Sequence, residues 1–385
     1  MDATVSSNSS TKVSVVIPAR NEEANLERCL RSLVVQKGVP FEILVLNDDS
    51  TDRTRAIAES FTRVRQCPFI ALNEYLIDVH VIDAPQPLPE GWTGKANALV
   101  AAESATGQPA LKGDWILFTD ADTEHLEGSL AAAVADAEEH KVDLLSYSPE
   151  QLLTGIRQQL LMPVIFGELA MRYSPRRVSD PALPDAAANG QYLLVRAEAH
   201  RKLGGFASVA TELLEDVALA HRYKSAGAPI LFRMGRGAVR TRMYSSWDDL
   251  RVGWRKNLAL LFPDARELAT KRSTEFFRLA ISVAFSVFWT MVVAARGVTS
   301  VDWLVYIALI ALWLYTLSNF GVFYARVSRA HFNFWQTLLS VCGLPIFARL
   351  LRESADAHEK GVVSWRGRAY RTSGADAASR ASNSK

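Results

Sequence analysis

Two carboxylates, one residue apart, follow a short apolar run. Asp120 and Asp122 come directly after the run WILFT at 115–119. If that run is a strand, its period of two places both side chains on one face. Paired hard oxygen ligands at a strand end suit Mg²⁺ or Mn²⁺ bridged to a diphosphate. A chance acidic pair in a surface loop is the alternative, so the metal site needs support from other motifs.

A second acidic cluster, LNDDSTDRT at 46–54, closes another apolar run and opens a helical pattern. Its Asp48 stands where ligands bind in open α/β sheets. A carboxylate there could accept hydrogen bonds from a nucleobase imide or a ribose hydroxyl. Helix capping by Asp49, Ser50 or Asp52 is the alternative interpretation.

Two further charged positions open helical patterns. Gly94 and Lys95 begin an Ala-rich helical pattern, and the N-terminus of a helix attracts phosphate. The residues around Lys95 lack the GxxxxGK[ST] spacing of a P-loop, which excludes a P-loop ATPase. Glu215 and Asp216 begin the other. A carboxylate facing a metal–diphosphate cleft could remove a proton from a hydroxyl. The alternative for Lys95 is a simple exposed lysine at a helix start. The alternative for Glu215 and Asp216 is a favourable interaction of acids with the helix dipole.

The segment 246–262 combines aromatic, aliphatic and basic residues. Trp247, Leu250, Trp254 and Leu258 share one helical face, and basic residues that include Arg255 lie beside it. This pattern just before apolar segments predicts a helix in the bilayer interface, with a core helix as the alternative. The apolar stretch 152–171 is a further candidate for lipid contact.

The elements that must position these residues alternate between strand-like and helical patterns over 13–240, which predicts an α/β fold. Strand-like runs lie at 13–17, 41–46, 77–81 and 115–119, and helical patterns lie at 22–35 and 52–64. Asn21 is the candidate N-cap of the first helix.

Three long uncharged runs follow, at 279–295, 303–325 and 332–348. The second is long enough to span a bilayer, and the first becomes so if Phe276 and Phe277 join it. The third is predicted to span or to re-enter. Basic residues cluster before the first run and after the second and third, whereas the intervening loop holds Arg296. This asymmetry predicts a multi-pass protein of the cell (inner) membrane with its N-terminal part and its tail in the cytoplasm.

Composition excludes several classes. With 49% hydrophobic residues the chain must fold, and a net charge of +2 gives no case for nucleic-acid binding. Cys29, Cys67 and Cys342 are too widely spaced for a disulfide framework or a zinc knuckle. The polar start predicts no secretory signal.

Taken in order, VSVVIPARNEE, EILVLNDDSTDRT, Asp120-Ala-Asp122 and LLEDVALAHRYKSAG resemble the family 2 glycosyltransferases over about residues 12–262. The motifs GWTGK, AAANGQYLLVR, Gly204-Gly205, GWRKN and SWRGRAY resemble the membrane-bound hopene-associated, carotenoid-acid (diaponeurosporenoate) and ceramide glucosyltransferase groups. The resemblance implies a GT-A (nucleotide-diphospho-sugar transferase) Rossmann-like domain followed by transmembrane helices.

The same resemblance implies roles for individual residues. Those that would contact the nucleotide sugar are Pro18, Arg20, Glu22, Asp48, Lys95, Asp120 and Arg242. Asp120 and Asp122 would hold Mg²⁺ or Mn²⁺, Asp216 would be the catalytic base, and Trp247, Trp254 and Arg255 would meet the acceptor or the membrane. Asp49 replaces the usual glycine of a DDGS pattern, and the QxxRW motif of processive members is missing from the region 252–256.

We therefore expect inverting, metal-dependent transfer of one sugar from a nucleotide-diphosphate sugar, UDP-linked, to a hydroxyl or carboxylate of a membrane lipid. A polyprenyl-phosphate sugar synthase, a polysaccharide-synthesis enzyme and a non-catalytic nucleotide-sugar-binding scaffold are the alternatives. The expected division of the chain is a disordered start at 1–11, the transferase domain at 12–245, an interfacial helix and linker at 246–275, a membrane region at 276–348 with spans 276–295 and 303–325, and a basic tail at 349–385.

Overall fold

The computed structural model describes residues 12–62, 77–104, 111–296, 303–365 and 368–371. The predicted disordered start at 1–11, Cys67, and the end of the tail from residue 372 lie outside the described residues. The chain divides into two compact units, Met1–Leu152 with Tyr173–Met243, and Leu153–Arg172 with Tyr244–Lys385. The second unit therefore includes the stretch 153–172, which lies within the predicted segment 12–245.

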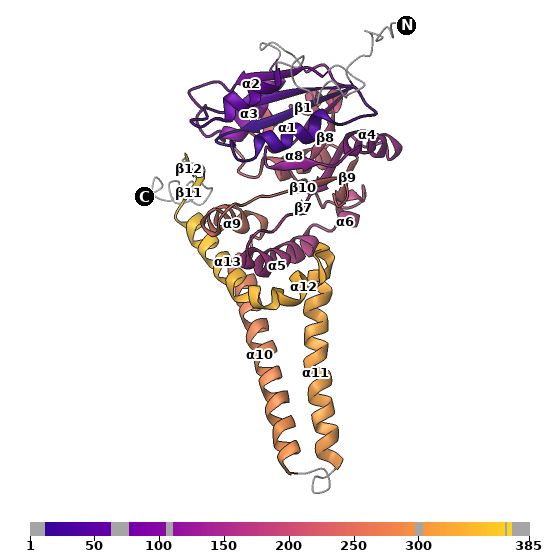
Figure 1. Cartoon of the computed structure of the whole chain (residues 1–385), viewed down its shortest axis with the longest axis vertical. Helices are drawn as coiled ribbons and strands as arrows, with labels where there is room; N and C mark the ends of the chain where they lie inside the picture. The colour runs from indigo at the N-terminus through magenta and orange to yellow at the C-terminus, as the bar shows by residue number, and fades with distance from the viewer. Residues whose placement is uncertain (1–11, 63–76, 105–110, 297–302, 366–367, 372–385) are drawn as a thin grey trace, which may run out of the picture. The chain divides into compact units, whose positions relative to one another are not determined.

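The first unit is built on a seven-stranded sheet, which confirms the predicted mixed α/β fold (Figure 1). Its strands run in the order β3 (Val79–Asp83), β2 (Phe41–Asn47), β1 (Val13–Ala19), β4 (Trp115–Phe118), β8 (Leu193–Arg196), β6 (Leu144–Ser148) and β9 (Ile230–Met234). The first four are parallel, and β8 is antiparallel to both of its neighbours. Strands β2 and β4 are buried along their whole length, as expected for a sheet covered on both faces.

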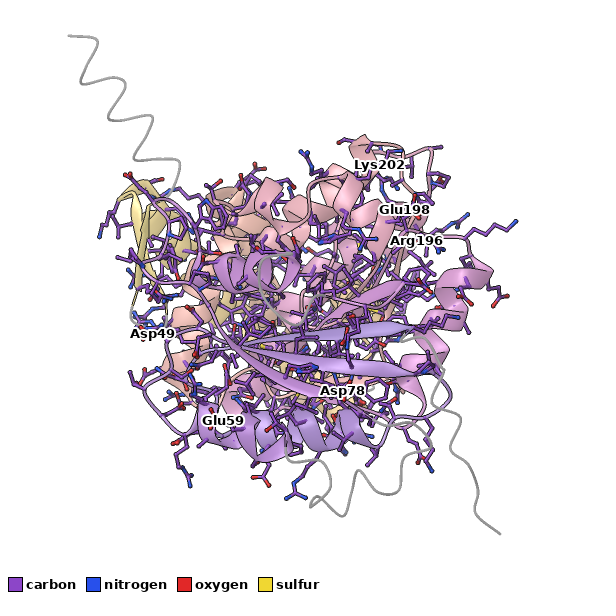
Figure 2. All side chains as sticks on the ribbon, turned by 90° about the horizontal axis from the view of Figure 1, so that it is seen from above. Asp49, Glu59, Asp78, Arg196, Glu198 and Lys202 are labelled. Atoms are coloured by element: carbon purple, nitrogen blue, oxygen red, sulfur yellow. The ribbon has the colours of Figure 1, made fainter. Side chains whose placement is uncertain are left out.

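The helices of this unit are α1 (Leu26–Val34), α2 (Thr54–Thr62), α3 (Gly94–Glu103), α4 (Ser129–Glu139), α6 (Pro175–Ser179), α7 (Ala197–Lys202) and α8 (Glu215–Ser225), with a 3₁₀ turn, η3, at Phe206–Val209. A small second sheet has the order β5 (Thr123–His125), β10 (Val239–Thr241), β7 (Glu150–Gln151). Charged side chains such as Glu59, Glu198 and Lys202 lie on the outside of the unit (Figure 2).

The helical spacing predicted for α1 is confirmed, because Leu26, Cys29, Leu30 and Leu33 are all buried. Its predicted N-cap is wrong. The helix begins four residues after the position expected from Asn21, whose backbone has a left-handed φ of 53°. The intervening residues form a turn that contacts the acidic segment after β2, where Asn21 Oδ1 accepts a hydrogen bond from the Thr51 N–H at 2.9 Å.

In its described residues, the second unit is helical apart from one antiparallel pair of strands. It contains α5 (Ile156–Arg172), α9 (Trp247–Leu261), α10 (Ala265–Arg296), α11 (Trp303–Val327), η5 (Ser328–Ala330), α12 (Phe334–Leu339), η6 (Ser340–Gly343), α13 (Leu344–Glu359), β11 (Val362–Trp365) and β12 (Arg368–Arg371). Helices α10 and α11 lie side by side and extend beyond the other helices of the unit (Figure 1). Ser286 Oγ and Thr316 Oγ1, 3.0 Å apart, join them.

Three stretches within the described residues are long and apolar enough to cross a membrane, judged by length and composition: Ala265–Arg296, Trp303–Ala330 and Phe334–Glu359. The predicted third run at 332–348 is not one straight helix. It is divided among α12, the 3₁₀ turn η6 and the start of α13. Helix α13 then packs against α9 and α10.

Two buried glutamates and two partly buried arginines join α5, α10 and α11. Glu168 lies 2.7 Å from Arg272 and 2.9 Å from Arg326, and Glu275 lies 2.7 Å from Arg272 and 2.8 Å from Arg326. Each carboxylate thus contacts both guanidinium groups, and the charges balance. Because buried ions are tolerated only when they are paired, this cluster constrains where the three helices meet.

Candidate functional site

A pocket in the first unit lies at the carboxyl ends of β1 and β4, the edge where open α/β sheets bind ligands. It is lined by Pro18, Lys95, Leu99, Phe118, Thr119, Asp120, Gly190, Phe206, Glu215 and Asp216. The predicted residues Pro18, Lys95, Asp120 and Asp216 therefore come together here from four separate parts of the chain.

Lys95 is the cation of this pocket, on the first turn of α3. The Thr93 side chain caps that helix by accepting the Ala96 N–H at 3.1 Å. The Lys95 Nζ lies 2.7 Å from an Asp120 oxygen and 3.1 Å from a Glu215 oxygen. Burial lowers the pKa of Lys95, but the carboxylates around it raise that pKa well above its usual value. Lys95 is thus a fixed positive charge that can face a diphosphate.

Asp216 is held by backbone N–H groups. Its Oδ2 accepts a hydrogen bond from Gly190 at 2.7 Å, and its Oδ1 accepts one from Val217 at 2.8 Å. Burial, with a contribution from the Glu215 charge, raises the pKa of Asp216 to about 6. A carboxylate with that pKa is ionised near neutral pH and is more basic than an exposed one, as a general base requires.

Gly190 brings the base and the cation close together. A Cβ at this position would lie 2.9 Å from the Lys95 Nζ and 3.3 Å from the Asp216 Oδ2. Any larger residue would therefore push one of these charged groups away. The motif AAANGQYLLVR contains this glycine, but its residue types alone do not predict this role.

Asp122 is suited to hold a cation. Among the residues that the structure describes, no group forms a hydrogen bond with its buried Oδ1. Burial, together with the charge of Asp120, raises the pKa of Asp122 to about 7. An orphaned buried carboxylate oxygen beside a second carboxylate is unfavourable unless a positive charge joins them. The two predicted metal ligands therefore fit a divalent ion.

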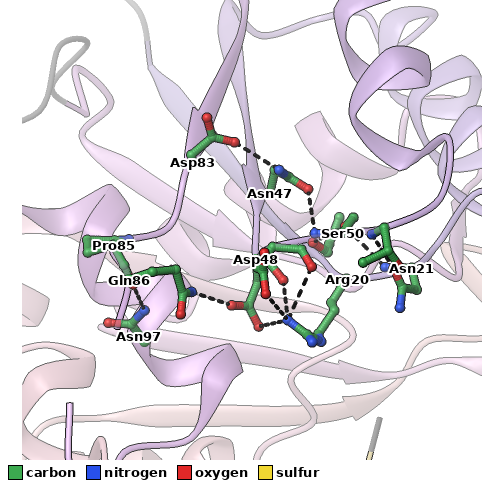
Figure 3. Close-up of polar contacts among 12 residues, drawn as sticks. Arg20, Asn21, Asn47, Asp48, Ser50, Asp83, Pro85, Gln86 and Asn97 are labelled. Carbon is green, nitrogen blue, oxygen red and sulfur yellow. Dashed lines mark hydrogen bonds and ion pairs between the residues drawn. The ribbon is translucent and has the colours of Figure 1, made fainter. Parts of the chain in front are cut away.

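Asp48 stands at the end of β2, in a network that Figure 3 shows. Arg20 Nη1 donates to the Asp48 carbonyl at 2.7 Å and lies 4.0 Å from its Oδ2. On the other side, Gln86 Nε2 donates to Oδ1 at 3.3 Å. Asn97, two residues after Lys95 on α3, donates to the Pro85 carbonyl at 2.9 Å and anchors that loop. No sequence motif marks Gln86 or Asn97, so neither was predicted as a site residue.

Asp49 replaces the glycine of the usual pattern in the turn after Asp48. Its φ is +54°, in the left-handed region that glycine enters at least cost. The turn therefore keeps a glycine-like conformation. It is supported by Asn47, whose Oδ1 accepts the Ser50 N–H at 3.3 Å and whose Nδ2 donates to Asp83 at 2.8 Å (Figure 3).

The remaining predicted nucleotide contacts border the same carboxylates. The charge of Glu22 is close enough to Asp122 to raise the pKa of the latter. Arg242 follows β10, and its backbone N–H donates to the Asp122 carbonyl at 3.4 Å. These positions place both residues near the candidate metal ligands.

Trp247, Trp254 and Arg255 belong to α9 in the second unit. Most of the apolar face predicted to enter the bilayer interface is covered within that unit, since α13 and α5 pack against α9. Leu250, Trp254 and Leu258 are buried, and Trp247 is partly buried. Trp254 is 3% exposed and donates to Met162 Sδ at 3.3 Å. Lipid exposure of Trp254 is therefore a wrong expectation. The core-helix alternative describes this face, because the second unit supplies its own apolar partner.

Comparison with known proteins adds to this geometry. Residues 14–203 match the family described as Glycosyl transferase family 2. The chain is 24% identical over 372 residues to the 4,4'-diaponeurosporenoate glycosyltransferase of Staphylococcus aureus strain USA300, a match that covers 93% of this chain and 88% of that protein.

Solved structures are similar at lower identity. S. aureus TarS 1–349 in complex with UDP-GlcNAc has 15% identity and a TM-score of 0.40, with 94% of this chain and 96% of that chain covered. The mannosyltransferase PcManGT from Pyrobaculum calidifontis, in complex with GDP-Man and Mn²⁺, has 14% identity and a TM-score of 0.43, with 91% and 87% covered. Residues 14–203 match the family model, the carotenoid-acid relative spans most of the chain, and a charged pocket lies at the sheet edge. It follows that the chain is a nucleotide-sugar-dependent glycosyltransferase with a family 2 domain.

Proposed function

We propose that this glycosyltransferase moves a single sugar from a UDP-sugar to a membrane lipid, with inversion at the anomeric carbon. The observation that carries the proposal is the pocket in which Asp216, ionised near neutral pH, lies beside Lys95 and the carboxylate of Asp120. Asp216 accepts the proton of the acceptor hydroxyl while the acceptor oxygen attacks the anomeric carbon from the face opposite the diphosphate. Lys95 stabilises the negative charge that develops on the leaving group.

The residues around Asp122 fit a divalent cation such as Mg²⁺ or Mn²⁺. Asp120 and Asp122 would hold it, and it would neutralise the departing diphosphate. The support is the buried Oδ1 of Asp122, which has no hydrogen-bond partner among the described residues.

The groups around Asp48 favour a uracil base. The carboxylate is an acceptor with a donor on each side, Gln86 at Oδ1 and Arg20 near Oδ2. The imide edge of uracil has the complementary order acceptor, donor, acceptor. Guanine has a second donor on this edge that would oppose one of the flanking donors, and cytosine has an acceptor where the carboxylate needs a donor.

Nucleotide competition tests this donor assignment. We expect UDP and dTDP, which share the imide edge, to bind about tenfold more tightly than GDP or CDP. A donor or acceptor left without its partner costs about 1–3 kcal/mol, and about 1.4 kcal/mol corresponds to a factor of ten. Gln86→Ala should reduce the preference for UDP over GDP about fivefold, whereas Glu90→Ala in the same exposed loop should leave it unchanged. Calorimetric titration of the full chain measures the four constants, and equal affinity for UDP and GDP would contradict the assignment.

The second unit supports a membrane location. Helices α10 and α11 expose aromatic and aliphatic side chains along their length, including Phe277, Phe285 and Leu314. Helix α12 is too short to span, yet it directs Phe334 and Trp335 outward while Gln336 and Thr337 are partly covered. We infer that α10 and α11 cross the inner membrane, that α12 lies in its interface, and that the catalytic domain is cytoplasmic.

Lipid extracts provide the test of the whole proposal. The full chain in nanodiscs made from native lipids and supplied with UDP-glucose, UDP-galactose or UDP-N-acetylglucosamine should give a lipid whose mass increases by one sugar. Chelation with EDTA should abolish the product. Sugar found only on polyprenyl phosphate, on a growing polymer or on soluble acceptors would favour the alternative enzymes, and donor binding without any product would favour a scaffold.

A further inference from the structure

A chain of hydrogen bonds lies next to the pocket and runs through Glu103, His200 and Tyr223. His200 on α7 is 1% exposed, and its two ring nitrogens lie 2.7 Å from Glu103 Oε1 and 3.0 Å from the Tyr223 hydroxyl. Glu103 is the last residue of α3, whose first turn carries Lys95. Tyr223 is on α8, whose first turn carries Glu215 and Asp216. His200 therefore joins the two helices that carry Lys95, Glu215 and Asp216, through residues that do not line the pocket.

The same carboxylate holds the backbone of Phe206. The Phe206 N–H donates to Glu103 Oε2 at 3.1 Å and to Oε1 at 3.3 Å. The preceding residue, Gly205, has a left-handed φ of 53°, and a Cβ there would collide with the Glu103 carboxylate. The Gly204-Gly205 pair thus allows the turn to come close enough for this hydrogen bond. Its second glycine is needed both for backbone conformation and for space.

Phe206 contributes an apolar wall to the pocket. Its ring lies edge-on to Phe118, with centroids 4.8 Å apart, and both rings line the pocket beside Asp120 and Asp216. Apolar rings next to the reacting groups exclude water and strengthen the electrostatic interactions there. The wall is therefore adjacent to the place where a water molecule could compete with the acceptor.

We propose that Glu103 and His200 are positioning residues that hold Phe206 in this wall and so keep water from the donor's anomeric carbon. The inference rests on the proposed role of Asp216. In the unwanted reaction the water oxygen bonds to the anomeric carbon, the bond from that carbon to the diphosphate oxygen breaks, its electron pair leaves with the nucleoside diphosphate, and Asp216 takes the water proton. A displaced Phe206 should favour this hydrolysis over transfer.

Two measurements test the proposal on the full chain in nanodiscs. Hydrogen exchange followed by mass spectrometry reports on the Phe206 N–H in the absence of any sugar donor. Exchange in a peptide covering 204–208 should accelerate at least about tenfold in Glu103→Ala. It should accelerate much less in Glu103→Gln, because the glutamine amide oxygen still accepts this hydrogen bond. Release of UDP from the UDP-sugar that the wild type uses reports function. The ratio of hydrolysis to transfer should rise several-fold in Glu103→Ala and in Phe206→Ala, and return toward the wild-type value in Glu103→Gln.

Controls separate a positioning role from general destabilisation. Ser14 lies at the start of β1, at the end of the strand opposite the pocket, and donates a buried hydrogen bond of 2.6 Å to the carboxylate of Glu42 on β2. Ser14→Ala removes this hydrogen bond. It should lower the melting temperature without changing the ratio. In the double variant Glu103→Ala/Phe206→Ala, the ratio should be no higher than in either single variant, because both act on one wall.

Unchanged exchange at 204–208 in Glu103→Ala, or additive effects in the double variant, would overturn the proposal. So would an increased ratio in Ser14→Ala equal to that in Glu103→Ala. A wild type that uses no UDP-sugar would instead refute the proposed donor, and the exchange measurement would still decide whether Glu103 holds the turn.

Discussion

Asp216→Asn is expected to reduce the turnover number for sugar transfer about 10³-fold while the affinity for the nucleotide changes little, since a positioned general base contributes about 10²–10⁴ in rate. The asparagine keeps the size of the side chain and can still accept the Gly190 N–H, which Asp216 accepts at 2.7 Å. It cannot take the proton of a hydroxyl. Single-turnover transfer and equilibrium binding of UDP, measured on the same preparation, separate the two effects.

Glu198→Gln is a matched control for this prediction. Glu198 is an exposed acid in the first turn of α7, just as Asp216 is an acid in the first turn of α8. If the only role of Asp216 is to stabilise the N-terminus of α8 through its charge, the two variants should behave alike, with small losses of stability and full activity. A fully active Asp216→Asn enzyme would also indicate an acceptor that is already an anion, as in a polyprenyl-phosphate sugar synthase.

The pH dependence of the rate follows from the same residue. Burial raises the pKa of Asp216 to about 6, and the base acts in its ionised form. The rate should therefore fall as the pH drops below about 6, approaching tenfold per pH unit. If the base were an exposed aspartate, the rate would begin to fall only at a pH about two units lower.

Arg326→Met is expected to destabilise the second unit by about 3–5 kcal/mol, the usual result of removing one partner from a buried ion pair. In the native protein both carboxylates of the cluster, Glu168 and Glu275, contact Arg326, at 2.9 and 2.8 Å. With Arg326 replaced, two buried negative charges would share Arg272 alone. Methionine fills much of the volume of arginine, so the loss of stability reflects the missing positive charge more than lost packing.

The matched control for this substitution is Arg329→Met, on the exposed 3₁₀ turn that directly follows α11. Thermal unfolding in detergent or nanodiscs should show a large shift for the first variant and a small one for the second. Combining Arg326→Met with Glu168→Gln should restore part of the loss, because one uncompensated charge is then removed. Equal shifts for both single variants would contradict the role of the cluster.

Local patterns in the sequence predicted the elements and motifs that lie close together along the chain. The strands β1, β2 and β4 read as apolar runs because the sheet buries both of their faces, and Asp48 and Asp120 follow two of these strands. Asp216 stands in the first turn of a helix that the sequence also predicts. The wall residue Phe206 and the contacts of Glu103 could not be predicted in this way. They depend on a hydrogen bond between residues 103 positions apart, which leaves no periodic pattern.

The error at Trp254 has a similar cause. An amphipathic pattern shows that one face is apolar, but it does not say whether lipid or protein covers it. Here the partner is α5, which precedes Trp254 in the chain by a long interval and occupies the same unit. The spacing of apolar residues on α9 is the same in either case, so only the tertiary structure distinguishes them.

The place of α5 in the chain has a consequence for biosynthesis. Its Glu168 and its partner Arg272 are 104 residues apart, and the intervening chain completes much of the first unit. When α5 leaves the ribosome, the helices that will cover its apolar and charged surface have not yet been translated. A stop codon after residue 245 would thus release a polypeptide with an uncovered helix, prone to aggregation and degradation. A soluble fragment of this enzyme should therefore be designed by replacing 153–172 with a short linker, not by truncation alone.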